Sequence, residues 1–313
     1  MSRSLHLVEP SLAAALADFP SARLSIEVLP ELRARGAQIP PPVDTNDIRV
    51  ESHFVRGAEA IRVLILRPLG RSGPLPAFLQ IHGGGYVLGS PEMCAPRNYQ
   101  VAVECGCVVA SVDYRLAPET RAPGAVEDCY EVLCWLRDEA ASLDIDPSRI
   151  AIGGDSAGGG IAAALGLMAR DRGEVEICFQ LLNCPMLDDR TAASNSRNPY
   201  VGEFRWTADA NRFGWTALLG HAPGLPDVSP YCAAARAEDL AGLPPTYISV
   251  GALDLFLDEN VEYARRLLEA GVPTELHVIP GAYHGFEYAT ESPVSVRALQ
   301  ERREALGRAF AGR

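Results

Sequence analysis

The stretch Gly154-Asp155-Ser156-Ala157-Gly158 decides how the centre of this chain is interpreted. It follows the apolar run 149–153 and opens onto the small, apolar residues 159–168, which predicts a strand, a tight turn and a helix in that order. Glycines beside the serine let such a turn close and expose the hydroxyl at the top of a sheet. The pattern therefore predicts that Ser156 is a nucleophile.

Apolar strands and helical stretches alternate around this turn. Strands are expected at 47–54, 61–67, 77–81, 107–112, 150–152, 177–182, 246–250 and 275–279, and helices at 125–141, after Ser156, at 258–270 and from about 293 to the end. The first two strands, joined at 56–58, indicate an antiparallel start. Continuous apolar strands separated by helices are typical of an α/β fold, with a mostly parallel sheet covered on both faces.

Two segments depart from this alternation. Residues 1–45 are expected to form one or two amphipathic helices and a proline-rich connector, and residues 185–230 are irregular and rich in aromatic residues. We expect both to cap a core made of 46–184 and 231–313, over the carboxyl end of the sheet, where sites in open α/β sheets lie. The alternative for 185–230 is a surface excursion with a small core of its own.

A serine nucleophile needs a base, and the base needs a third group that orients it. His284 lies in a turn-rich loop just after the strand at 275–279, at the same sheet end as Ser156. Asp254 directly follows the strand at 246–250, whereas Asp258 begins the next helix and is expected to cap it. We therefore favour Asp254 as the acid and His284 as the base.

Acyl transfer also requires donors for a developing oxyanion. His82 ends a buried strand and leads into Gly83-Gly84-Gly85, whose backbone N–H groups can approach a ligand closely. The N–H of Ala157, at the start of the next helix, is the natural third donor. The alternative for the triple glycine is a flexible turn.

These motifs together resemble the hormone-sensitive-lipase-like (bacterial family IV) esterases of the α/β-hydrolase superfamily. The resemblance rests on residues 82–85, 113–119, 154–159, 254–259 and 284–286, in that order, and the Ser-Asp-His order is that of an α/β-hydrolase. It implies an eight-stranded sheet with a helical cap. It also assigns the triad to Ser156, Asp254 and His284, and the oxyanion hole to Gly83, Gly84 and Ala157.

One position departs from the family pattern, since Leu255 stands where a proline usually follows the acid. Leucine can line an acyl pocket, so Leu255 is a candidate for its wall. Residues 113–119 are interpreted as structural, with charges that pair beneath the glycine loop. Further candidates for the pocket walls are Tyr86, Phe204, Trp206 and Trp215.

Composition excludes several other chemistries. All 28 basic residues are arginine, so Schiff-base, pyridoxal-phosphate and P-loop lysines are excluded. The net charge of −12 argues against nucleic acid and anionic membranes as partners. Eight cysteines without a Cys-x-x-Cys pair are interpreted as buried thiols in a reducing cytoplasm. No histidine–carboxylate cluster has metal-ligand spacing, no cofactor is expected, and neither a signal peptide nor a membrane-spanning run is predicted.

The predicted activity is hydrolysis of short to medium acyl esters by a serine carboxylesterase acting on a small-molecule ester. Two alternatives remain open on the same fold: a lyase or dehydratase, and a non-catalytic binding protein. Relatives of the second kind have lost the catalytic histidine, whereas His284 is present. The resemblance also suggests a homodimer through the sheet edge.

Overall fold

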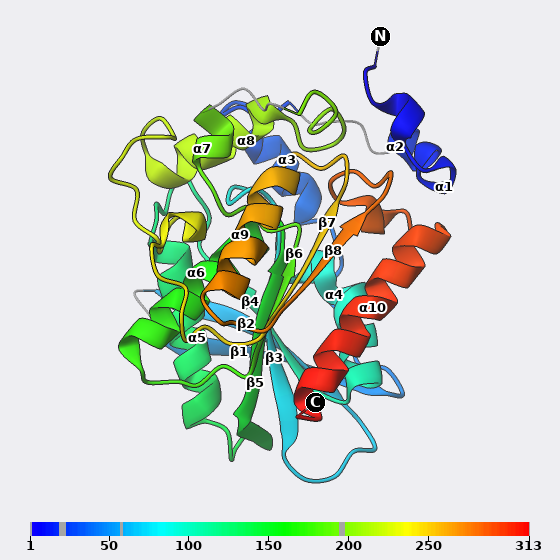
Figure 1. Cartoon of the computed structure of the whole chain (residues 1–313). Helices are drawn as coiled ribbons and strands as arrows, with labels where there is room; N and C mark the ends of the chain where they lie inside the picture. Colours follow the sequence, from blue (N-terminus) through cyan, green and yellow to red (C-terminus); the bar gives the residue numbers. More distant parts are fainter. Residues whose placement is uncertain (1, 19–22, 57–58, 194–197, 313) are drawn as a thin grey trace.

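A single eight-stranded sheet runs through the centre of the molecule (Figure 1). The computed structural model describes residues 2–18, 23–56, 59–193 and 198–312. The strands are β1 (Ile48–Arg56), β2 (Ala60–Pro68), β3 (Leu75–Ile81), β4 (Val108–Asp113), β5 (Ile145–Asp155), β6 (Phe179–Asn183), β7 (Thr246–Gly251) and β8 (Thr274–Ile279). Their order is β1-β2-β4-β3-β5-β6-β7-β8; β2 is antiparallel to both neighbours and all other pairs are parallel. The predicted fold class is confirmed.

Helices cover both faces of this sheet. They are α1 (Pro10–Ala13), α2 (Ala15–Asp18), α3 (Leu29–Gly36), α4 (Pro91–Cys105), α5 (Gly124–Asp138), α6 (Ala157–Arg172), α7 (Arg190–Ala193), α8 (Ala208–Leu219), α9 (Leu257–Glu269) and α10 (Pro293–Phe310), with 3₁₀ turns η1 (Leu5–Leu7), η2 (Ala234–Arg236) and η3 (Phe286–Tyr288). Strand side chains alternate between the faces. In β2, Ile65 packs in the cluster with α5, α6 and α9, whereas Leu64 and Leu66 pack in the cluster with α4 and α10.

Several helices differ from the sequence expectation: the described part of residues 1–45 contains α1, α2 and α3 where one or two helices were expected, and α4, α7 and α8 were not expected. Helix α4 is not predicted by the sequence pattern, because Pro96 lies inside it and an internal proline normally argues against a helix. Pro91 at its first turn is compatible with helix geometry. Helix α8 lies inside the segment that reads as irregular; it begins after Thr207, whose side chain accepts a hydrogen bond from the Ala210 N–H.

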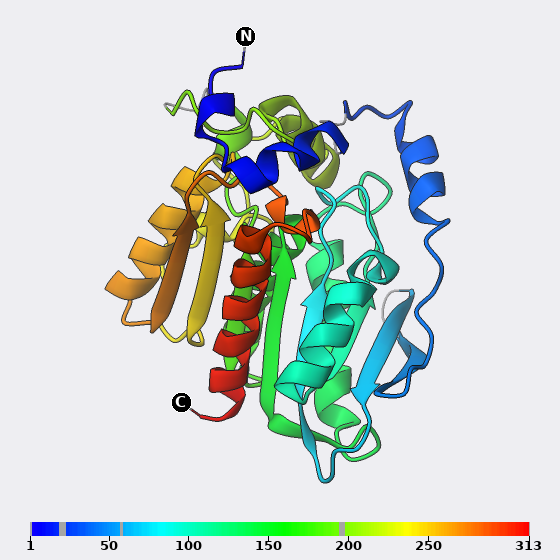
Figure 2. The same ribbon diagram turned by 90° about the vertical axis from the view of Figure 1, so that its right-hand side faces the viewer.

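The N-terminal segment and the inserted segment meet at the carboxyl end of the sheet. Figure 2 shows α1 and α2 beside the inserted segment, at the end to which the parallel strands point. The Glu203 carboxylate accepts hydrogen bonds from the Arg3 and Ser4 N–H groups, at 3.0 and 2.9 Å. Tyr283, next to the predicted base, donates to the carbonyl of Leu12 at 3.1 Å. Residues 19–22, 57–58 and 194–197 of the predicted segments lie outside the described residues.

Candidate active site

Ser156 occupies a strained turn between β5 and α6. Its φ angle is +57°, a region that side-chain-bearing residues rarely adopt. Space for the turn comes from the flanking glycines. A Cβ on Gly154 would lie 2.5 Å from the Ile81 carbonyl oxygen, and one on Gly158 would lie 2.2 Å from the same atom. The Ser156 N–H donates to the Asn183 carbonyl at 2.8 Å, which anchors the turn to β6.

His284 lies within hydrogen-bond distance of both Ser156 and Asp254. The His284 Nε2 lies 2.9 Å from the Ser156 Oγ, and the His284 Nδ1 lies 2.8 Å from an Asp254 carboxylate oxygen. Their exposed fractions are 8% for Ser156, 9% for His284 and 1% for Asp254. Water therefore competes little for these bonds, and the geometry is that of a nucleophile, a base and the group that orients the base.

The structure distinguishes the two candidate acids. The second carboxylate oxygen of Asp254 accepts the Phe256 N–H at 2.9 Å, so both oxygens of this buried group have partners. Asp258 is exposed and lies in the first turn of α9, whose N-cap is Phe256. The expectation that Asp258 caps this helix is therefore wrong, and Asp254 is the residue that contacts His284.

The three glycines after β3 form a tight loop beside the nucleophile. Gly83 lies against the turn, since a Cβ there would come within 2.8 Å of the Asp155 carbonyl oxygen and 3.5 Å of the Ser156 Cβ. Gly84 has a φ of +130°, and a Cβ on it would collide with the Leu88 carbonyl oxygen at 2.0 Å. Ala157 is the first residue of α6, where N–H groups lack intrahelical acceptors.

His82 supports this loop from within the protein. Its exposed fraction is 1%, and its Nδ1 donates to the Gly83 carbonyl at 2.9 Å. The ring stacks on Tyr114 with centroids 4.2 Å apart. Burial lowers the pKa of His82, which keeps the imidazole neutral. It orders the glycine loop rather than taking part in the contacts of the triad.

Residues 113–119 brace the same region, as predicted. Arg33 of α3 forms an ion pair with Glu119 at 2.7 Å and donates to the Ala117 carbonyl at 2.7 Å. The Ala117 N–H in turn donates to the Tyr86 carbonyl at 3.0 Å, directly after the glycine loop. These charges are therefore used in structural pairs.

Aromatic side chains of the inserted segment approach the triad. The Trp206 ring lies 6.1 Å from the His284 ring and covers Gly85, where a Cβ would meet it at 2.1 Å. Phe204 packs on Tyr283 with centroids 6.0 Å apart. Leu255 contacts this segment as well, since a Cβ on Gly202 would lie 2.7 Å from its side chain.

The other two candidate wall residues are more deeply enclosed. Tyr86 is 2% exposed and donates its hydroxyl to the Met186 carbonyl at 2.9 Å. Its ring lies 5.2 Å from the fully buried ring of Trp215 in α8. The two rings join α8 to the glycine loop, and their contact with a ligand stays a prediction.

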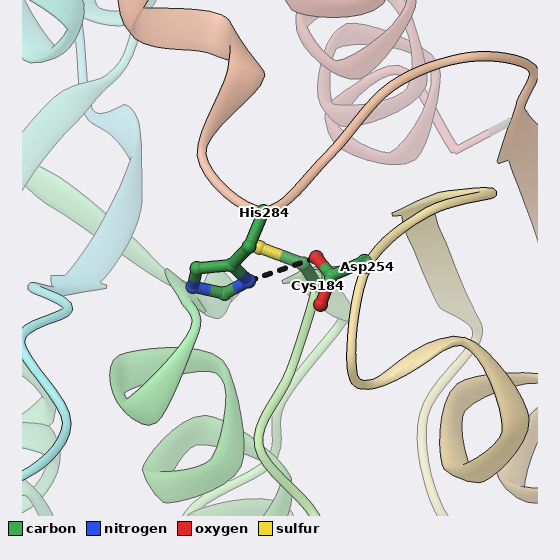
Figure 3. A group of neighbouring side chains, drawn as sticks. All are labelled: Cys184, Asp254 and His284. Atoms are coloured by element: carbon green, nitrogen blue, oxygen red, sulfur yellow. Dashed lines mark hydrogen bonds and ion pairs between the residues drawn. The ribbon is translucent and has the colours of Figure 1, made fainter. Parts of the chain in front are cut away.

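Cys184 lies beside the acid and the base. Its sulfur, a carboxylate oxygen of Asp254 and a ring nitrogen of His284 all lie within 4.8 Å of one another (Figure 3). Burial raises the pKa of the Cys184 thiol well above its ordinary value. These are atoms of metal-ligand type. However, a metal bound there would have to displace the hydrogen bond between Asp254 and His284.

Two residues at the site were missed by sequence reasoning. Asn183 ends β6, accepts the Ser156 N–H and donates its amide to the Asp155 carboxylate at 2.7 Å. Asp155 precedes the nucleophile and lies between Arg97 and Arg302. A polar residue at the carboxyl end of a buried strand was the available signal for Asn183.

Comparison with known proteins agrees with this geometry. A family model for the alpha/beta hydrolase fold matches residues 78–288. The chain belongs to this family. Carboxylesterase NlhH of Mycobacterium tuberculosis is 36% identical over 316 residues, which covers 97% of this chain and 96% of that protein. The structure of a bacterial heroin esterase is 41% identical with a TM-score of 0.90, covering 98% of this chain and 99% of the other.

A third relative is similar over a shorter stretch. Ethyl acetate hydrolase of Pseudomonas putida is 32% identical over 236 residues, covering 72% of this chain and 73% of that protein. These relatives confirm the resemblance to hormone-sensitive-lipase-like esterases and the predicted carboxylesterase class. Within the part of the chain that the structure describes, no helix has the length and apolar composition needed to cross a membrane.

Proposed function

We propose that this chain hydrolyses short to medium acyl esters through a covalent acyl-enzyme on Ser156. His284 Nε2 takes the proton of the Ser156 hydroxyl as the oxygen attacks the ester carbonyl carbon, and Asp254 stabilises the imidazolium that forms. The imidazolium then protonates the leaving alcohol oxygen as its bond to the acyl carbon breaks. The observation that carries this proposal is the pair of hydrogen bonds through His284, at 2.9 and 2.8 Å.

In the second half of the reaction, water replaces the alcohol. His284 removes one proton from the water as it attacks the acyl carbon, and the bond to Ser156 Oγ breaks as that oxygen regains a proton. In both halves, the backbone N–H groups of Gly83, Gly84 and Ala157 stabilise the tetrahedral oxyanion. The close approach of Gly83 to Ser156 supports this role.

We propose that residues 1–45 and 185–230 form the cap of a catalytic core made of 46–184 and 231–313. The bonds between Glu203 and the N-terminal backbone support a joint cap. Trp206, Phe204 and Leu255 would line the acyl pocket, with Tyr86 and Trp215 behind the glycine loop. Trp206 covers Gly85 and lies 6.1 Å from the His284 ring, and the name of the ethyl acetate hydrolase relative denotes a two-carbon acyl group. Both favour short acyl chains.

Replacing the nucleophile tests the reaction. Ser156→Ala should lower turnover of p-nitrophenyl acetate by about 10³-fold or more, with an unchanged melting temperature, because the covalent step is lost. Ser148→Ala is the matched control, since Ser148 lies on β5, the strand that precedes Ser156, but is exposed and away from the triad. An organophosphate should add to the peptide that contains Ser156. Substantial hydrolysis by Ser156→Ala would exclude the mechanism.

A panel of p-nitrophenyl esters tests the acyl preference. Turnover efficiency should be highest for short to medium chains and fall beyond them, because the cap limits the depth of the pocket. A steady rise beyond dodecanoate would contradict the preference without affecting the assignment of Ser156.

We also propose a cytoplasmic location and a homodimer through the sheet edge. All eight cysteines are free thiols, as is usual in a reducing compartment. At the sheet edge, β8 carries Val278 with an exposed fraction of 42%, which would be covered by a partner strand. The net charge of −12 disfavours nucleic acid as a partner.

A further inference from the structure

Four charged side chains form a cluster directly beneath the triad. We call Asp155, Glu287, Arg97 and Arg302 the four-charge cluster. Arg302 of α10 pairs with Glu287 of η3 and lies 3.7 Å from the Asp155 carboxylate. Arg97 of α4 lies 3.4 Å from the other Asp155 oxygen. Asp155 is thus held between two guanidinium groups from the helices that cover one sheet face.

The cluster is balanced in charge and shielded from water. Glu287 and Arg302 are 2% and 5% exposed, and the side chains of Arg97 and Asp155 are 20% and 25% exposed. Burial alone raises the pKa of Asp155, but the charges of Arg97 and Arg302, and to a smaller extent His284, hold it below its ordinary value. Two cations and two carboxylates therefore sum to zero at neutral pH.

This cluster is connected to both the nucleophile and the base. Asp155 immediately precedes Ser156, and Asn183 bridges them by donating to the Asp155 carboxylate and accepting the Ser156 N–H. Glu287 lies three residues after His284 in the same loop. A change of charge at Asp155 will therefore change the electrostatic potential at the His284 imidazole.

Other titratable groups also surround this region. Those facing His284 are Asp254 and Cys184, and those around the cluster are Cys94, Arg205 and Tyr288. Burial raises the pKa of the thiols at Cys94 and Cys184, so neither adds a charge at neutral pH. The guanidinium of Arg205 is a further positive charge, over the Tyr288 ring and near Glu287, and it is the same in every variant compared below. Asp155 is therefore the group whose neutralisation unbalances the cluster closest to the nucleophile.

We propose that Asp155 is a positioning residue that balances Arg97 and Arg302, so that the imidazolium of His284 can form above them. The proposal rests on the proposed function, in which His284 gains a positive charge in the transition state. When Asp155 is ionised, the His284 imidazolium forms near a four-charge cluster of zero net charge and next to the carboxylate of Asp254. When the charge of Asp155 is removed, the four-charge cluster carries one net positive charge. This charge repels the His284 imidazolium, and the repulsion is strong because the site is partly buried.

Asp155→Asn tests the proposal, because the amide keeps the shape and removes the charge. His284 must be neutral to act as a base, so activity is lost toward acid pH. An added positive charge nearby disfavours protonation of the His284 ring. We expect the acid limb of the kcat/KM profile to move down by about one pH unit and kcat to fall by about tenfold, with KM nearly unchanged.

Arg97→Gln provides the opposite test, because it leaves the cluster with one net negative charge. The acid limb of the kcat/KM profile should then move to higher pH. In the double variant Asp155→Asn, Arg97→Gln it should return to the wild-type pH. A structural defect would not be rescued by a second change. If Asp155→Asn does not fold, the upward shift in Arg97→Gln alone still decides the matter.

Profiles that stay at the wild-type pH in both folded single variants would overturn the proposal. So would shifts in the same direction, or a double variant worse than either single one. Ser156→Ala separates this inference from the proposed function. If Ser156→Ala is inactive while Asp155→Asn behaves as wild type, only the role of Asp155 fails; if Ser156→Ala is active, the proposed mechanism fails.

Discussion

At the scale of single residues, the site depends on which nitrogen of His284 carries the proton. The Nδ1 faces the Asp254 carboxylate at 2.8 Å, so it carries the proton and donates. This leaves Nε2 as an acceptor toward the Ser156 hydroxyl at 2.9 Å. A strained nucleophile is thus paired with a base already in the correct tautomer.

Asp254→Asn should lower kcat by about 10³–10⁴-fold with little change in KM, because an amide N–H facing Nδ1 favours the wrong tautomer of His284. The fold should persist, since the amide oxygen can still accept the Phe256 N–H. Asp258→Asn is the matched control and should retain nearly full activity, as Asp258 is exposed. Steady-state kinetics on a short ester measures both. A fully active Asp254→Asn enzyme would remove Asp254 from the mechanism.

At the scale of elements, the inserted segment is tied to the core near the triad. The Gly202 N–H donates to the Leu253 carbonyl at 3.1 Å, next to the acid. Glu203 holds the N-terminal segment by bonds to the Arg3 and Ser4 N–H groups. Phe204 follows directly and packs on Tyr283, so these links determine how closely the aromatic residues cover the site.

Glu203→Ala should loosen this connection and raise KM for short esters by about two- to fivefold, because the bonds it removes contribute about 1 kcal/mol at a partly exposed site. The acyl-length optimum should move toward longer chains. Glu9→Ala is the control: Glu9 also accepts a backbone N–H in the N-terminal segment, at 2.8 Å from Ser11, but that bond is local. Equal acyl-length profiles for both variants would show that Glu203 does not shape the pocket.

At the scale of the whole molecule, one buried ion pair joins the last helix to the loop of the base. Glu287 and Arg302 are nearly inaccessible to water and pair with each other. Burial raises the pKa of Glu287, but the charge of Arg302 outweighs it and holds the pKa below the ordinary value of 4.5. A carboxylate with a lowered pKa stabilises the fold above its unfolded pKa, and this stabilisation is lost as pH falls through its folded pKa.

Glu287→Gln should therefore lower the free energy of unfolding by about 3 kcal/mol at neutral pH, because it removes the shorter of the two carboxylate contacts of the buried Arg302 and leaves only the 3.7 Å contact with Asp155. The difference from wild type should stay constant above about pH 5 and shrink as the pH falls below 4.5. Urea unfolding at pH 7 and pH 3.5 measures it. Glu304→Gln, an exposed site on the same helix, is the control and should be neutral. A difference independent of pH would refute the ionic explanation.

Local sequence patterns were sufficient to predict most strands and the three residues Ser156, Asp254 and His284 that the structure brings into contact. Ser156, Asp254 and His284 each follow a predicted strand directly or within a short loop, so the order of strands and loops places them at one sheet end. Helix α4 was missed because Pro96 interrupts its pattern, although packing between β2 and α10 stabilises it. Asp258 was misjudged because the turn after Asp254 is capped through the Phe256 N–H instead.

The sequence by itself determined the fold and the reaction class and predicted the residues of the proposed triad, because these depend on local order: strand, turn, helix, and a polar residue after each strand. Only the tertiary structure decided how Asp155 meets Arg97 and Arg302, and which aromatic side chains cover His284. These contacts join helices and loops far apart in the chain. Periodicity carries no information on such pairs, since ion pairing and ring packing depend on distances that exist only after folding.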